Sequence, residues 1–73
     1  MEKLLEILEE LKPGVDYKNE SNLVDDGVMD SLTIVELISA LEDEYGIEVT
    51  MEEFIPENFK SMQSIYDMIQ RLS

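Results

Sequence analysis

The hydroxyl of Ser31, between Asp30 and Leu32, is the side chain that the sequence most clearly sets apart for chemistry. Asp30 is a favoured N-cap residue, because its carboxylate can accept hydrogen bonds from the first amides of a helix. Ser31 then lies in the first turn, near unpaired amides and the positive end of the helix dipole, which suits an attached phosphate group. A lone serine there is most often only a helix-start residue. Its neighbours therefore decide whether it is predicted to be a modification site.

Composition restricts the other kinds of chemistry, because the 73 residues include no Cys and no His. Thiolate nucleophiles, disulfides and imidazole bases or ligands are thereby excluded. The acidic loop upstream is not an EF-hand calcium loop, since placing Gly27 at its sixth position puts Val24 at the third and Thr33 at the twelfth. Neighbouring carboxylates such as Asp25 and Asp26 have no evident apolar pocket to shift their pKa. We therefore expect no catalytic residues and no metal site, and a protein that is not an enzyme.

A helix over residues 31–45 is predicted to position Ser31, and Gly46 is its expected left-handed stop. At about 100° per residue its apolar stripe consists of Ile34, Leu37, Ile38, Leu41 and Tyr45. The other side carries Leu32, Glu36, Ser39 and Asp43, flanked by Val35, Ala40 and Glu42. Because Leu32 and Val35 are apolar side chains among carboxylates, this side is predicted to be a docking surface, with apolar contact for affinity and charge for steering. The alternative is that both are ordinary exposed apolar residues.

The chain before this helix is predicted to aim the serine. A first helix buries Leu4, Ile7, Leu8 and Leu11, and Pro13 with Gly14 ends it. Residues 13–29 show no helical period, and a loop longer than about 15 residues in so small a domain is expected to be functional. Apolar side chains that could fix the loop to the core are Val15, Tyr17, Leu23, Val24, Val28 and Met29. Gly27 permits the sharp turn before Asp30.

The chain after Gly46 is predicted to complete a helical bundle. Ile47 and Val49 point inward, residues 50–53 match a capping box that opens a short third helix, and Pro56 ends that helix. Residues 56–59 are interpreted as a turn with Phe59 buried, and Ser61 as the N-cap of the last helix. The last stripe contains Met62, Ile65, Ile69 and Leu72, with Tyr66 and Met68 at its edges. The predicted fold is all-α: three longer helices and a short third one form one domain over residues 1–73.

Charge restricts the partners. Eighteen Asp and Glu against five Lys and Arg give a formal net charge of -13, and residues 19–59 contain no basic residue. This field repels nucleic acid and anionic membranes and favours basic partners, although the run could simply be a solvated face. The sequence has no apolar run of about 18 residues that could span a membrane and no secretion signal. We expect a cytoplasmic monomer.

The residues around Ser31 resemble a known family. Gly27-Val28-Met29-Asp30-Ser31-Leu32, followed by Val35-Glu36-Leu37 and by residues 41–47 (LEDEYGI), is similar to the phosphopantetheine attachment region of acyl carrier proteins. The similarity covers nearly the whole chain, including its length, its acidity, the long first loop and the short third helix. The resemblance implies the four-helix bundle of acyl carriers. It also implies that Ser31 carries 4′-phosphopantetheine, transferred from coenzyme A, whose thiol holds cargo as a thioester.

The same resemblance implies roles for other residues and for partners. Asp30 would assist recognition by the phosphopantetheinyl transferase, and a partner-binding face would consist of Leu32, Val35, Glu36, Ser39, Ala40, Glu42 and Asp43. Basic patches on an acyl- or aminoacyl-activating ligase and on a downstream synthase or transferase would recognise that face. The cargo is delivered to these enzymes, and the tethered arm gives it a high effective concentration.

Two departures from the family pattern concern the cargo. Val28 and Met29 separate Gly27 from Asp30, where fatty acid carriers usually have one residue, and Ser39 replaces a large apolar residue. The spacing is closer to D-alanyl carriers and to free-standing aminoacyl or peptidyl carriers, and residues 56–59 likewise resemble the free-standing carriers of specialised pathways. A specialised acyl or aminoacyl cargo is therefore favoured over general fatty acid synthesis. Two alternatives remain: an unmodified acidic helical adaptor that binds a basic partner through the helix at residues 31–45, and a phosphorylation switch at Ser31.

Overall fold

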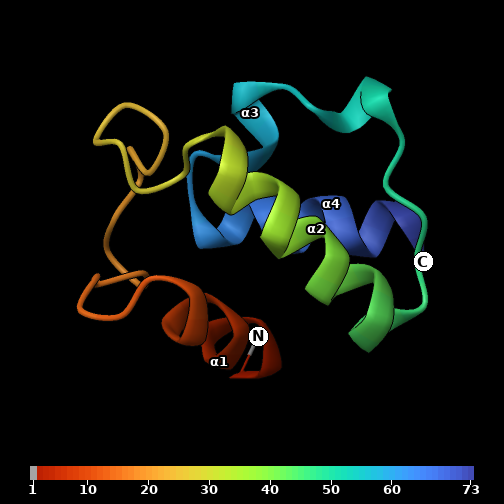
Figure 1. Ribbon diagram of the computed structural model, residues 1–73, viewed down its shortest axis with the longest axis horizontal. Coiled ribbons are helices and arrows are strands. Elements are labelled where there is room, and N and C mark those ends of the chain that lie inside the picture. Colours follow the sequence, from red (N-terminus) through yellow and green to blue (C-terminus); the bar gives the residue numbers. More distant parts are fainter. Residues whose placement is uncertain (1) are drawn as a thin grey trace.

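The structure, a computed structural model, describes residues 2–73 as helices joined by turns and loops (Figure 1). The helices are α1 (Glu2–Leu11), α2 (Ser31–Tyr45), α3 (Pro56–Phe59) and α4 (Met62–Leu72), with a 3-10 turn, η1 (Met51–Glu53), between α2 and α3. This confirms the predicted all-α bundle with a short third helix and a long loop after the first. Among residues 2–73, no helix combines the length and apolar character that a membrane crossing requires.

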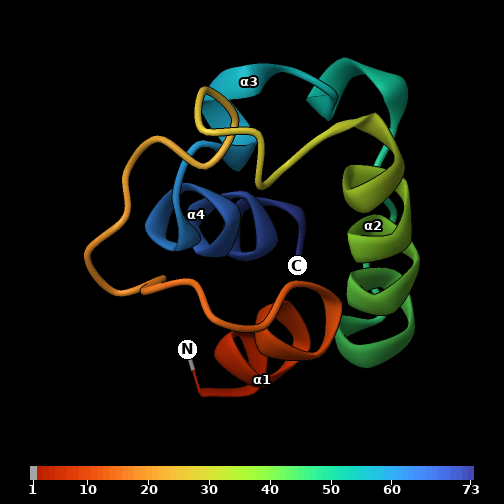
Figure 2. The same cartoon turned by 60° about the vertical axis from the view of Figure 1, so that its left-hand side comes forward.

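The helices form two pairs, which share one core. α1 packs against α2, α3 packs against α4, and α1 also contacts α4. Figure 2 shows α2 beside the α3–α4 pair, with α1 closing the lower end. The most deeply buried side chains come from every α-helix and from the first loop: Leu4, Leu8, Leu23, Leu37, Leu41, Phe59, Ile65, Met68 and Ile69. Met68, predicted at the edge of its stripe, lies fully in the core, whereas Leu72 is only half-buried.

The long loop from residue 12 to residue 30 is fixed to the core by its apolar side chains, as predicted. Tyr17, Leu23 and Met29 are buried in it. The Tyr17 hydroxyl contacts the carbonyl oxygens of Lys12 at 2.6 Å and Leu8 at 3.1 Å, where it satisfies the C-terminal end of α1. The Leu23 amide donates to the Lys60 carbonyl at 2.8 Å. Contacts at the C-terminal end of α1 and at Lys60, between α3 and α4, therefore hold the loop in place.

The segment after Val49 differs from its prediction. Residues 51–53 form a single 3-10 turn, and the Thr50 side chain makes no capping hydrogen bond. Pro56 begins α3 instead of ending a helix, because its fixed φ and missing amide hydrogen suit the first position of a helix. Residues 56–59 are thus a helix and not a turn. Phe59 is buried, as expected.

Candidate functional site

Asp30 caps the start of α2 and leaves Ser31 in the first helical position. The Asp30 backbone is extended, with φ -88° and ψ 176°, and its Oδ1 accepts a hydrogen bond from the Thr33 amide at 2.8 Å. Hydrogen bonds from the backbone and then the side chain of Thr33 hold the pKa of Asp30 below its ordinary value. Asp30 is therefore a carboxylate at neutral pH. Its N-cap role, inferred from the residue type, is confirmed.

The loop before Asp30 ends in a tight turn around one carbonyl group. The amides of Val28 and Met29 both donate to the Leu23 carbonyl oxygen, at 2.9 and 3.0 Å. Gly27 precedes them at φ +80°, a left-handed conformation that glycine adopts without strain. Met29 and Leu23 are buried. Because the residue directly before Asp30 is buried and hydrogen-bonded, the position of the helix start is fixed by the core.

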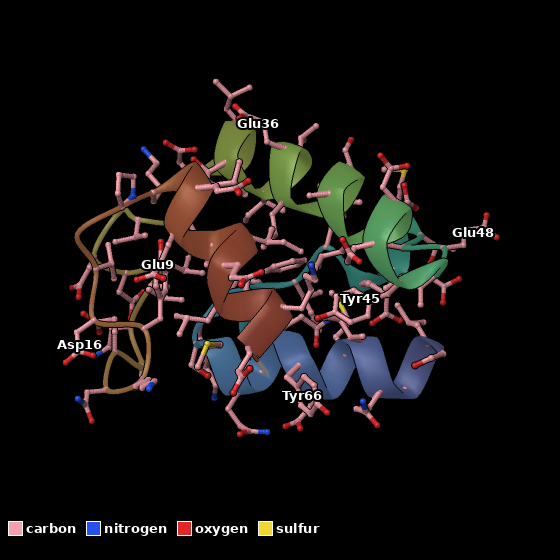
Figure 3. All side chains as sticks on the ribbon, turned by 90° about the horizontal axis from the view of Figure 1, so that it is seen from below. Glu9, Asp16, Glu36, Tyr45, Glu48 and Tyr66 are labelled. Carbon is pink, nitrogen blue, oxygen red and sulfur yellow. The ribbon has the colours of Figure 1, made fainter. Side chains whose placement is uncertain are left out.

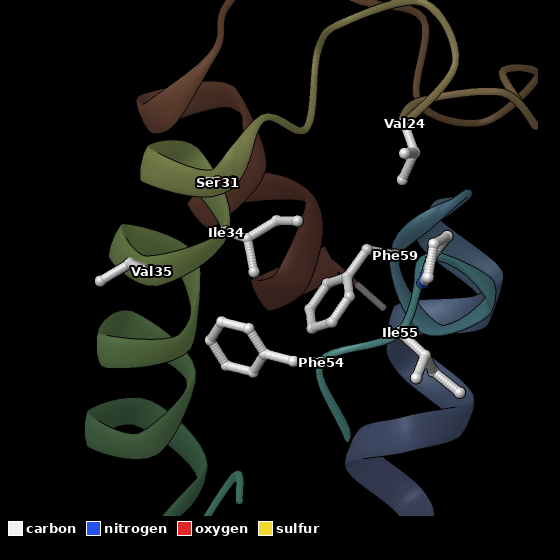
Figure 4. A pocket seen from close by; sticks show the side chains of 8 residues that line it. Val24, Ser31, Ile34, Val35, Phe54, Ile55 and Phe59 are labelled. Atoms are coloured by element: carbon white, nitrogen blue, oxygen red, sulfur yellow. The ribbon is translucent and has the colours of Figure 1, made fainter. Parts of the chain in front are cut away.

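Ser31 is exposed and lies at the rim of an apolar pocket of about 200 Å³ (Figure 4). One wall is formed by Ile34 and Val35 of α2. The other wall consists of Phe54, Ile55, Pro56 and Phe59, and Val24 of the loop closes one end. The serine hydroxyl can therefore accept a phosphate-linked group from solvent. Apolar groups attached to it would lie next to the pocket.

The sequence analysis did not predict this pocket. Phe54 and Ile55 are the unforeseen wall residues, 46% and 44% exposed respectively. The Phe54 ring meets the edge of Phe59 with ring centroids 6.3 Å apart and planes at 66°. The available signal was a run of three apolar residues, Phe54-Ile55-Pro56, directly after an acidic turn. Buried Thr33, in the first turn of α2, was also absent from the predicted stripe.

The docking face predicted on α2 is largely exposed. Leu32 is 69% and Val35 50% exposed, so their apolar surface is open to contact. Glu36, Ser39 and Asp43 are exposed too, and Figure 3 shows Glu36 on the side of α2 turned away from α4. Ala40 and Glu42 are half-buried at the edge of this face. The Oε2 atom of Glu42 accepts a hydrogen bond from the Val49 amide at 2.9 Å, so this carboxylate also has a partner inside the molecule.

Comparison with known proteins gives matches over most of the chain. A family model described as "Phosphopantetheine attachment site" matches residues 2–72. An acyl carrier protein of Buchnera aphidicola subsp. Baizongia pistaciae (strain Bp) is 57% identical over 53 residues, 73% of this chain and 65% of that protein. One from Thermobifida fusca (strain YX) is 30% identical over 73 residues, 97% of this chain and 90% of that protein. A third, from Buchnera aphidicola subsp. Acyrthosiphon pisum (strain Tuc7), is 43% identical over 53 residues, 73% of this chain and 64% of that protein.

These matches agree with the helical bundle. The chain spans slightly less than two thirds of the two Buchnera proteins, at 65% and 64% of their lengths. The family consists of carriers and not of enzymes, and its prosthetic group is covalently attached 4′-phosphopantetheine. With a family model that covers residues 2–72 and relatives that share the name, the chain belongs to the acyl carrier protein family.

Proposed function

We propose that Ser31 carries the 4′-phosphopantetheine arm and that the chain acts as a cytoplasmic carrier domain over residues 1–73. The observation that carries this assignment is the exposed Ser31 at the first position of α2, within the span that matches the phosphopantetheine attachment family. The first turn of α2 contains no acidic side chain. A phosphodiester on Ser31 would be close to the first amides of α2 and the positive end of the dipole, beside the Asp30 carboxylate that accepts from Thr33.

The residues around Ser31 have separate roles in the proposed carrier. In the transfer reaction the Ser31 hydroxyl oxygen forms a new bond to the phosphorus next to the pantetheine, and the phosphoanhydride bond of coenzyme A breaks. Adenosine 3′,5′-bisphosphate leaves, and the serine proton passes to a base of the transferase. Asp30 fixes the helix start that presents this hydroxyl. The bound arm supplies a thiol, which this chain without Cys lacks, to hold cargo as a thioester. Leu32, Val35 and Glu36 offer the exposed surface on which a transferase, an activating ligase and a downstream synthase with basic patches can dock.

The assignment of Ser31 is tested by intact mass. The unmodified chain is incubated with coenzyme A and a broad-specificity phosphopantetheinyl transferase, and the added mass is that of one phosphopantetheine. Ser31→Ala should gain no mass, whereas Ser39→Ala, which removes another exposed serine of α2, should gain the full increment. Modification of Ser31→Ala would show that the site is wrong. A mass increase of a plain phosphate on protein from its native host would favour the phosphorylation switch.

We also propose a specialised acyl or aminoacyl cargo. Beyond Val24 and Pro56 the apolar pocket is followed by a polar hollow of about 240 Å³, which Asp25, Glu57 and Lys60 line. A cargo with an apolar body and an amino group would suit both hollows, because a carboxylate can accept hydrogen bonds from an ammonium group. The two-residue step of Val28 and Met29 and the exposed Ser39 support the same class.

The cargo is tested by loading the holo chain with an aminoacyl group and, separately, with a fatty acyl group of similar length. Amide NMR shifts at Phe54 and Ile55 report the apolar pocket, and those at Asp25 and Glu57 report the polar hollow. The aminoacyl form should perturb both sets. If the fatty acyl form perturbed Phe54 and Ile55 and the aminoacyl form did not, the proposed cargo would be contradicted. The assignment of Ser31 would not be affected.

A further inference from the structure

Asp26-Gly27 is the one place in the sequence where a carboxyl side chain is followed directly by a glycine. The backbone amide nitrogen that follows an aspartate can attack the side-chain carbonyl carbon and close a five-membered succinimide ring. A glycine at the second position favours this reaction, because it has no side chain to obstruct the approach and its backbone has more conformational freedom than that of other residues. Gly27 therefore has a chemical consequence besides the turn that it permits before Asp30.

The structure leaves both residues open to this reaction. Asp26 and Gly27 are exposed, and no atom beyond the neighbouring residues lies within 4 Å of the point where a side chain on Gly27 would begin. The Gly27 amide donates to the Val24 carbonyl oxygen at 3.1 Å, in a turn on the surface. Because neither Asp26 nor Gly27 belongs to the core, this turn can open and free the amide at lower cost than the core can.

The contact with Glu20 favours the reactive form of the Asp26 side chain. A hydrogen bond with the Glu20 carboxyl, then the charge of Glu20, and more weakly the charge of Asp25 raise the pKa of Asp26. A neutral carboxyl group loses water when the amide nitrogen attacks it, whereas a carboxylate has no comparable leaving group. Asp30 is the contrasting case, because hydrogen bonds from Thr33 lower its pKa and keep it a carboxylate.

We propose that Asp26-Gly27, assisted by Glu20, is a site of spontaneous isomerisation through a succinimide to isoaspartate. The Gly27 nitrogen forms a bond to Cγ of Asp26, and the amide proton leaves with the carboxyl hydroxyl as water. Water then adds to the ring: cleavage at the backbone carbonyl carbon gives isoaspartate, and cleavage at Cγ restores aspartate. The water lost in the first step is regained in the second, so no other reactant is needed.

Isoaspartate would alter the turn that precedes Ser31. Its backbone runs through the former side-chain carbons, which lengthens the chain path at residue 26. The next two amides, of Val28 and Met29, both donate to the Leu23 carbonyl oxygen, at 2.9 and 3.0 Å. A longer path changes the position of these amides relative to Leu23, so the support for the start of α2 weakens. That the isomerised chain is then modified more slowly rests on the proposed attachment at Ser31.

Ageing of the unmodified, folded chain tests the site. After incubation at neutral and mildly acidic pH, a protein isoaspartate methyltransferase labels isoaspartate, and peptide mapping locates the label. Asp26→Glu keeps the carboxyl group but would need a six-membered ring, and Asp25→Glu is the matched control at the neighbouring exposed residue. Asp26→Asn, which reaches the same succinimide by loss of ammonia, is the positive control.

The wild type and Asp25→Glu should accumulate label at residue 26, and Asp26→Glu should stay at background. Glu20→Gln, which removes a charge that favours the neutral Asp26 carboxyl, should accumulate severalfold less label at neutral pH. An unlabelled wild type beside a labelled Asp26→Asn would overturn the proposal, as would label spread equally over Asp26 and Asp43. Equal labelling of Glu20→Gln and the wild type would overturn the role given to Glu20.

Amide hydrogen exchange separates the effect on the turn from the attachment site. The isoaspartate form, isolated by chromatography, should exchange the Val28 and Met29 amides faster than the fresh chain, with Ile69 in the core of α4 unchanged. Unchanged protection at Met29 would contradict the effect on the turn. Label and exchange are both read on the unmodified chain, so they stand or fall independently of Ser31, whereas the rate of the transferase reaction tests the step that rests on it.

Discussion

The carboxylate of Asp30 accepts the amide hydrogen of Thr33 across 2.8 Å, and this bond closes the first turn of α2 around Ser31. Thr33 is buried while Asp30 and Ser31 are exposed, so the turn has one side in the core and the other in solvent. The core side fixes the backbone at Thr33. The hydroxyl of Ser31 is thereby presented from a rigid support and not from a mobile loop.

Replacement of Asp30 by Ala should lower the melting temperature at pH 7 by a few degrees, because the Thr33 amide loses its acceptor. Asp30→Asn should stay near the wild-type value, since Asn is an equally good N-cap. The pKa of Asp30 is lowered in the folded state, so its contribution is present above the unfolded pKa, ordinarily 3.8, and is lost as the pH falls through the lower folded value. The melting temperatures of the wild type and of Asp30→Ala, measured at several pH values, should therefore converge at acidic pH.

The behaviour of Asp30→Asn distinguishes capping from charge. This variant keeps an acceptor at every pH, so its stability should depend less on pH than that of the wild type in the acidic range. A wild-type pH dependence in Asp30→Asn would mean that the carboxylate is not the group responsible. Rates of modification by the transferase, measured in parallel, would show whether the charge of Asp30 also matters for recognition.

The sequence predicts those features that depend on a few neighbouring residues. Asp30, Gly46 and Ser61 were identified as caps from their type and position, and each has the predicted role, with Gly46 at φ +65° and Ser61 accepting from Ser64. The burial of Leu37, Ile38 and Leu41 on α2 followed from the helical period, whereas Ile34 and Tyr45 of the predicted stripe are half-buried. Ser31 was singled out by the same local pattern, with family resemblance giving it a specific chemistry.

The features that the sequence did not predict depend on contacts between distant elements or on ambiguous signals. Pro56 can follow one helix or begin the next, and its position in the sequence does not decide between the two; in the structure it begins α3. Glu42 looked like a surface carboxylate, since no local pattern reveals its bond to Val49. The pocket requires Phe54 to lie across from α2, a relation that no periodicity encodes.

Tyr17→Phe should reduce the free energy of unfolding by about 1 kcal/mol, because the carbonyl groups at the end of α1 lose a donor. The loss should appear in urea unfolding as a lower midpoint with an unchanged slope. Tyr66→Phe is the matched control: Tyr66 is half-buried on α4 and its replacement should change stability by less than about 0.5 kcal/mol. Equal losses in both variants would mean that the loss is not specific to the contacts of the Tyr17 hydroxyl with Leu8 and Lys12, and no loss in Tyr17→Phe would mean that Tyr17 contributes through its ring.

Phe54→Ala should destabilise the fold by about 1 kcal/mol, since an edge-to-face aromatic pair contributes roughly this amount beyond simple burial. Because Phe54 is 46% exposed, a cost typical of a core aromatic residue is not expected. Met51→Ala, at a residue 89% exposed on η1, should be nearly neutral and serves as the comparison. Chemical denaturation of both variants measures the difference, and a neutral Phe54→Ala would show that its ring does not support the pocket wall.

Asp26→Asn should raise the melting temperature at pH 7 in low salt. A hydrogen bond with the Glu20 carboxyl, followed by the charge of Glu20, raises the pKa of Asp26 in the folded state, so folding favours its protonated form. The contribution of Asp26 to the stability of the fold is then greatest below its unfolded pKa and declines as the pH rises through its folded pKa. An uncharged Asn removes this decline.

Salt provides the second arm of this test. Both carboxylates are near solvent, and with a net charge of -13 the wild type should gain stability as ionic strength screens like-charge repulsion. The advantage of Asp26→Asn should accordingly shrink as salt is added, and should be smaller for Asp25→Asn, whose charge is the weakest of the influences on Asp26. Thermal unfolding across a salt series measures all three chains. A melting temperature of the wild type that does not respond to salt would show that repulsion in the acidic loop does not limit the stability of the bundle.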